Sequence, residues 1–130
     1  MSNDSVWSDA KLIRSFLVRD GWRSPDTYCN FYARVTDIPA VYLFLLYMDA
    51  YGSGYDKAMV AYVGMSTALR TRIYSHNVLP QLNRPGYWPM RWFKPTFVGN
   101  LRSTERHYIE RFNPPWNISG RKRGVELAHG

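Results

Sequence analysis

Two apolar runs separated by a glycine-rich stretch constrain the fold of this chain most strongly. Residues 40–48 and 58–64 are rich in branched and aromatic side chains, and Pro39 and Asp49 bound the first run. Between them, residues 52–54 read Gly-Ser-Gly, which is typical of a loop. The pattern predicts a β-hairpin with a long loop at the centre of a small α/β (α+β) domain.

Three helices are predicted around this hairpin. Residues 7–20 have Ser8 or Asp9 as a possible N-cap and an apolar face formed by Leu12, Ile13, Phe16 and Leu17. A second helix begins after Ser66 or Thr67 and reaches about His76, and a third covers residues 101–112. The remaining segments are less regular. Residues 77–95 contain four prolines and are interpreted as an irregular insertion over the core, whereas residues 96–99 are predicted to form a short third strand.

The charge of the chain favours a polyanionic partner. Its 130 residues include 17 Lys and Arg against 10 Asp and Glu, for a net charge of +7, and 13 of the 17 cations are Arg. Arg presents a planar fork that matches phosphate, so a small domain rich in Arg and Tyr favours nucleic acid. The 45% hydrophobic content excludes a disordered chain. No apolar run reaches the ~20 residues that a membrane-spanning helix needs.

The cysteine content and the N-terminus bear on the cellular compartment. Cys29 is the only cysteine, so no disulfide can form within the chain. Residues 1–4 show neither the basic nor the apolar region of a signal peptide. We therefore expect a cytoplasmic, reducing location and no membrane partner.

Glu105 stands out in the third predicted helix. At 100° per residue it falls within an apolar stripe formed by Leu101, Tyr108, Ile109 and Phe112. A carboxylate on a core-facing stripe is costly unless it is compensated. Taken alone, the pattern leaves three alternatives: a structural salt bridge with an Arg, a metal ligand, or a surface Glu that reaches solvent.

The second predicted helix carries a further set of polar residues. Arg72 and His76 lie at i, i+4 beside an apolar ridge of Leu69 and Ile73, whereas Arg70 projects away. The pair is either a phosphate clamp or, more ordinarily, cationic compensation of the helix C-terminus. Tyrosine is common in strands, so packing is the default role of the two hairpin residues Tyr42 and Tyr62.

Read in chain order, these residues resemble the GIY-YIG nuclease family. The resemblance covers residues 39–118 and rests on Pro39-Ala40-Val41-Tyr42, Tyr62-Val63-Gly64, Arg72, His76, Glu105 and Asn117. Ala40 replaces the usual first Gly, and Val replaces Ile in both motifs. Residues 1–38 would then be an N-terminal helix and connector packed on this nuclease domain, and residues 119–130 a loose basic tail.

The resemblance implies a three-stranded antiparallel sheet flanked by helices, and a phosphodiesterase that acts on DNA with one Mg²⁺ or Mn²⁺ ion. Glu105 would hold that ion, and Arg72 would hold a non-bridging phosphate oxygen. Tyr42 would take the proton from water. A free phenol has a pKa near 10, so Tyr42 would need help from His76 or a nearby cation.

Three residues would support this site or shape it. Tyr62 and Gly64 would shape it, the latter by close backbone approach, and Asn117 would brace it by hydrogen bonds.

We therefore expect a metal-dependent DNA endonuclease that acts as a monomer and pairs only transiently on DNA. The alternatives are a non-cleaving nucleic-acid-binding module of the same fold and a basic protein-interaction domain. DNA is expected to run along a face containing Arg70, Arg84, Arg91 and the tail residues Arg121, Lys122 and Arg123. Trp88 and Trp92 would either stack on bases there or cover the core.

Overall fold

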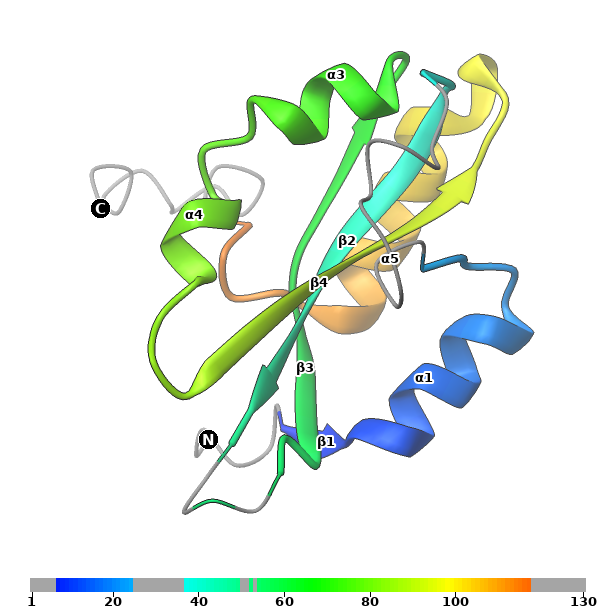
Figure 1. Cartoon of the computed structure of the whole chain (residues 1–130). Coiled ribbons are helices and arrows are strands. Elements are labelled where there is room, and N and C mark those ends of the chain that lie inside the picture. Colours follow the sequence, from blue (N-terminus) through cyan, green and yellow to red (C-terminus); the bar gives the residue numbers. More distant parts are fainter. Residues whose placement is uncertain (1–6, 25–36, 50–51, 53, 118–130) are drawn as a thin grey trace.

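The computed structural model of the chain describes residues 7–24, 37–49, 52 and 54–117 (Figure 1). Within these residues, one antiparallel sheet has the strand order β1-β3-β2-β4. Its strands are β1 (Ser8–Asp9), β2 (Ala40–Met48), β3 (Lys57–Ser66) and β4 (Tyr87–Pro95). The α+β class and the hairpin of β2 and β3 are confirmed, but the sheet has four strands rather than three.

The central strand β2 explains the unbroken apolar run of residues 40–48. It pairs with β3 on one side and with β4 on the other, and Ala40 through Tyr47 are all buried. Both of its faces are covered, so it shows no alternation of polar and apolar residues. A β-bulge in β3 places Ala61 as an extra residue between the pairs Phe44–Tyr62 and Leu45–Val60.

The prediction of an irregular insertion over residues 77–95 is wrong. The segment contains helix α4 (Leu79–Leu82) and the nine-residue strand β4, which pairs along the whole of β2. β4 is the outer strand of the sheet, with only an isolated bridge from Arg23 to Phe93 on its far side. Proline is tolerated on such a strand because an outward-facing position needs no N–H donor, so Pro89 does not prevent pairing.

The prediction of a short strand at residues 96–99 is also wrong. The chain there turns through a 3₁₀ helix, η3 (Val98–Asn100), directly into α5 (Leu101–Phe112). The predicted range of this last helix is confirmed. Asn113, with φ of 46° in the left-handed region, ends it.

The N-terminal helix α1 (Ala10–Arg19) is confirmed, with Asp9 as its N-cap. Its contact face differs in part from the predicted one. Leu17 is fully buried and Ile13 is partly buried against the core, but Leu12 is 70% exposed. The buried side is centred on Ala10, Ile13 and Leu17, at i, i+3, i+7 spacing, so Leu12 falls outside it.

The helix α3 (Leu69–Tyr74) is shorter than predicted. Ser66 Oγ accepts a hydrogen bond from the Ala68 N–H, so it stabilises the turn before the helix rather than the helix itself. His76 lies beyond the last helical turn. Leu69 and Ile73 are buried, as the predicted ridge requires.

The sheet separates two apolar clusters. One contains Val41, Leu43, Leu45 and Tyr47 of β2, with α1 and α5 packed on them. The other contains Ala40, Tyr42, Phe44 and Leu46, with α3 and α4 packed on them. The N-terminal helix therefore packs on the sheet of its own chain. Among the described helices, none is long and apolar enough to cross a bilayer.

Candidate active site

The two hairpin tyrosines lie together on the α3 side of the sheet. Tyr42 of β2 is 2% exposed, and Tyr62 of β3 is half-buried, with their ring centroids 6.2 Å apart. The bulge at Ala61 shifts the pairing of β3 by one residue, and Tyr62 packs against the same cluster as Tyr42. Their hydroxyls are within hydrogen-bonding reach of each other.

Arg72 brings a cation to these phenols. It is half-buried on α3 and lies within hydrogen-bonding reach of both hydroxyls, whereas Arg70 is exposed. This confirms the prediction that Arg72 lies beside the apolar ridge of the helix and that Arg70 projects away from it. Asp37 fixes this helix, because its carboxylate accepts hydrogen bonds from the Thr71 N–H at 3.2 Å and the Thr71 hydroxyl at 2.8 Å. No local pattern in the sequence pointed to Asp37.

Burial raises the pKa of both tyrosines above the usual value of 10. The charge of Arg72 opposes this rise at each phenol. The hydrogen bond between them acts in opposite directions, raising the pKa of Tyr42 and lowering that of Tyr62. Of the two phenols, Tyr62 is the one that is accessible to solvent.

His76 lies beneath the site as a neutral ring. It is 4% exposed and packs edge-on against Tyr62, Phe44 and Tyr42, at centroid distances of 4.8, 5.0 and 5.5 Å. Burial, and secondarily the charge of Arg72, lower its pKa to about 4.

The hydrogen bonding of His76 also fixes its tautomer. Its Nδ1 accepts from the Val78 N–H at 3.1 Å, which assigns the ring proton to Nε2. A neutral His76 cannot supply the positive charge that we expected to assist Tyr42, so Arg72 is the cation in that position.

Glu105 of α5 lies on the Tyr62 side of this group. Its carboxylate is half-buried, and its charge raises the pKa of Tyr62. Burial raises the pKa of Glu105 itself, and the flanking Arg102 and Arg106 only partly offset that rise. Leu101 and Tyr108 of the predicted stripe are buried, so Glu105 does project from the packed side of the helix.

Gly64 and Asn117 act on the strand that carries Tyr62, the first by leaving space and the second by hydrogen bonds. A Cβ on Gly64 would lie 2.5 Å from Cζ and Oη of Tyr42, so this position must be glycine for the ring to keep its place. The buried Asn117 side chain accepts from the Val63 N–H at 2.7 Å and donates to the Val63 carbonyl at 2.6 Å. It thereby continues the sheet at the outer edge of β3.

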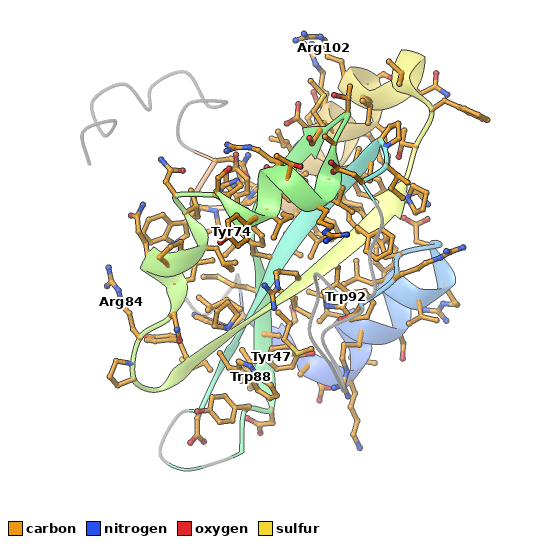
Figure 2. All side chains as sticks on the ribbon, turned by 45° about the horizontal axis from the view of Figure 1, so that its top comes forward. Tyr47, Tyr74, Arg84, Trp88, Trp92 and Arg102 are labelled. Carbon is orange, nitrogen blue, oxygen red and sulfur yellow. The ribbon has the colours of Figure 1, made fainter. Side chains whose placement is uncertain are left out.

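The expected DNA contacts are only partly brought together. Arg70 and Arg84 are exposed, and Arg91 is half-buried on the α3 side of β4, where it lines a cavity of about 460 Å³ with His76 and Asn83. Figure 2 shows Arg84 on the connection that leads into β4 and far from Arg102 of α5. Residues Arg121, Lys122, Arg123 and Cys29 lie outside the described part of the chain.

The two tryptophans of β4 differ in exposure, and only Trp92 has the expected role of covering the core. Trp92 is 5% exposed and covers the core on the α1 side of the sheet. Trp88 is 52% exposed, and its ring lies 5.9 Å from that of Tyr47.

The residues around Glu105 are compatible with one hard divalent cation. Among the described residues, no group of three His, Cys, Asp or Glu side chains could enclose a metal. Mg²⁺ is commonly held by one or two carboxylates, several waters and substrate phosphates rather than by a complete protein cage. A single half-buried carboxylate such as Glu105 meets that smaller requirement.

Comparisons with known proteins do not assign this site. No protein-family model matches it, and neither a curated protein nor a solved structure is significantly similar to it.

Proposed function

We propose that the protein is a metal-dependent endonuclease that hydrolyses DNA phosphodiester bonds. The observation that carries the proposal is that Arg72 interacts with both Tyr42 and Tyr62. The charge of Glu105 also acts on Tyr62. These side chains come from the successive elements β2, β3 and α3 and from the more distant helix α5. Packing alone does not require a carboxylate, a guanidinium and two phenols at one place.

Each side chain has a role in hydrolysis. Arg72 binds a non-bridging oxygen of the phosphate through its planar fork. Tyr62 faces the attacking water and accepts its proton, while Tyr42 donates a hydrogen bond to the Tyr62 oxygen and favours its ionised form. Glu105 would hold a Mg²⁺ or Mn²⁺ ion, which supplies charge neutralisation at the phosphate and at the leaving 3′ oxygen.

Exposure divides these residues into two groups. Tyr62, Arg72 and Glu105 are half-buried and accessible to a substrate. Tyr42 and His76 are buried beneath them and act as positioning residues. This division moves the base role proposed for Tyr42 on sequence grounds to Tyr62, because Tyr42 is nearly inaccessible to a water molecule.

The direct test is cleavage of supercoiled plasmid with Mg²⁺, with Mn²⁺ and with EDTA. Glu105→Gln should abolish cleavage, while affinity for duplex DNA, measured in EDTA, changes by less than about threefold. Glu110→Gln on the exposed side of the same helix is the matched control and should cleave like the wild type. Loss of a group that stabilises the leaving oxygen corresponds to several kcal/mol in the transition state.

Two outcomes would refute the proposal. Cleavage by Glu105→Gln at the wild-type rate would remove Glu105 from the site. Duplex binding without cleavage under any metal condition would instead favour a non-cleaving nucleic-acid-binding module. We further propose that the protein is a monomer that nicks one strand at a time, so nicked circles should accumulate before linear DNA.

A further inference from the structure

A groove between α1 and β4 lies on the sheet face opposite the Tyr42 site. It has a volume of about 1010 Å³, against about 540, 190 and 460 Å³ for three other cavities among the described residues. Tyr47, Trp88 and Trp92, which line it, are labelled in Figure 2. We call it the α1–β4 groove, and its volume lies at the upper limit of the ~300–1,000 Å³ that is typical of pockets for small organic ligands.

One wall of the α1–β4 groove is cationic. Four of its lining residues carry a positive charge, namely Lys11, Arg14, Arg19 and Arg23, and no described lining residue is acidic. Lys11, Arg14 and Val18 recur at i, i+3, i+7 spacing, so they share one side of α1. The charge of Arg14 lowers the pKa of Tyr47 against the larger effect of burial, so this cation acts on the floor of the groove, where the buried Tyr47 hydroxyl has no hydrogen-bond partner in the described structure.

The remaining surface is aromatic. Trp22, Tyr47 and Trp92 are each at most 5% exposed, and Trp88 presents a 52% exposed ring beside Tyr47. The buried indole N–H of Trp92 has no hydrogen-bond partner within the described structure. A buried donor left without an acceptor is costly.

We propose that the α1–β4 groove binds a segment of single-stranded nucleic acid. The cations would hold its phosphates, and the exposed face of Trp88 would stack on a base. A single strand is favoured over a duplex because only unpaired bases offer an open face for stacking and a free edge for hydrogen bonding. An acidic peptide would use the cations but would leave the aromatic wall without a specific partner.

The inference does not depend on catalysis at Glu105. The α1–β4 groove and the Tyr62 site lie on opposite faces of the sheet, and binding in the groove requires no metal. All measurements are therefore made in EDTA, where failure of the proposed nuclease activity leaves the result unaffected.

The test measures the fluorescence anisotropy of a labelled twelve-residue oligothymidylate at low salt. Trp88→Ala should weaken binding about tenfold, the magnitude expected for loss of one stacked base, and Trp88→Phe should restore part of it. Arg23→Ala should weaken binding and reduce the slope of log affinity against log salt by about one. Both positions are exposed, so the variants should keep the wild-type melting temperature.

Two controls separate the groove from general electrostatics. Arg102→Ala, at an exposed position of α5 outside the groove lining, should leave affinity for oligothymidylate within about twofold. An abasic oligonucleotide of the same length should respond to Arg23→Ala but not to Trp88→Ala, because it has phosphates and no bases. Unchanged oligothymidylate affinity in both groove variants, or an equal loss in Arg102→Ala, would overturn the proposal.

Discussion

Tyr42 and Gly64 face each other across the central strands, and the tyrosine ring occupies the space that any side chain at position 64 would need. They are paired in the register of β2 and β3, and a Cβ at position 64 would lie 2.5 Å from both Cζ and Oη of Tyr42. The phenol is 2% exposed and cannot move aside into solvent. The position of Tyr42, and of the hydrogen bond it shares with Tyr62, therefore depends on the absence of a side chain across the strand pair.

Gly64→Ala should lower the stability of the protein and displace Tyr42. We expect a loss of about 1–3 kcal/mol in the free energy of unfolding, as for other overpacked cores. Cleavage should fall by more than the fraction of unfolded protein explains. Gly99→Ala is the matched control, since a Cβ there meets nothing within 4 Å. Equal melting temperatures for the two variants would contradict the close contact.

Tyr62→Phe should reduce turnover at least as strongly as Tyr42→Phe, because Tyr62 is the accessible phenol of the pair. We expect losses of about 100-fold and about 10-fold, respectively. Since the pKa of each phenol is raised, the wild-type rate should still be rising with pH at pH 10, and this rise should disappear in Tyr62→Phe. Pre-steady-state rates between pH 7 and pH 10 measure it. A Tyr62→Phe variant with the wild-type profile would exclude Tyr62 as the base.

Arg72→Lys should be nearly as damaging as Arg72→Ala. Lysine keeps the charge but loses the planar fork that reaches a phosphate oxygen and the two phenols together. We expect a reduction of about 100-fold in kcat, with unfolding measured in parallel. Arg70→Lys, on the exposed side of the same helix, should stay within about threefold of the wild type. Equal losses in the two lysine variants would indicate a general effect of charge instead.

The stability of the protein should fall as the pH drops from about 6.5 towards 4, in part because of His76. Its pKa is lowered to about 4 in the folded state, against an ordinary value of 6.5, so the unfolded chain binds the proton more readily across this interval. The contribution is fully present above pH 6.5 and amounts to about 3 kcal/mol at most. Denaturant unfolding at several pH values measures the slope.

A pair of variants isolates this histidine. His76→Gln retains an acceptor for the Val78 N–H but does not titrate, so the dependence on pH in this interval should flatten. His107→Gln, at an exposed position on α5, should retain the wild-type slope. A wild-type slope in His76→Gln would assign the effect to other groups.

Asn117→Ala should destabilise the sheet at β3. The substitution removes both hydrogen bonds to Val63 and leaves a buried N–H and a buried carbonyl without these partners, at a cost of about 1–3 kcal/mol. Asn83→Ala, at an exposed position after α4, should change stability by less than about 0.5 kcal/mol. Thermal melts of the two variants provide the comparison.

Local pattern was sufficient for several parts of the fold. The continuous apolar run of residues 40–48 predicted a strand, and the helical periodicity of residues 101–112 predicted both ends of α5. The wheel also placed Glu105 on the packed side of that helix and separated Arg72 from Arg70. Local pattern failed for residues 77–95, where four prolines suggested irregular structure. Whether proline is tolerated in β4 depends on the position of this strand at the edge of the sheet.

The sequence by itself determined the residue types at the candidate site and the elements that carry them, because periodicity and turn chemistry act over a few residues. The tertiary structure alone decided the electrostatics. Burial by residues distant in the chain keeps His76 neutral and raises the pKa values of Tyr42, Tyr62 and Glu105. The tertiary structure also brought α1 beside β4 and so formed the α1–β4 groove. Desolvation depends on what packs around a group in three dimensions, which no spacing within one segment records.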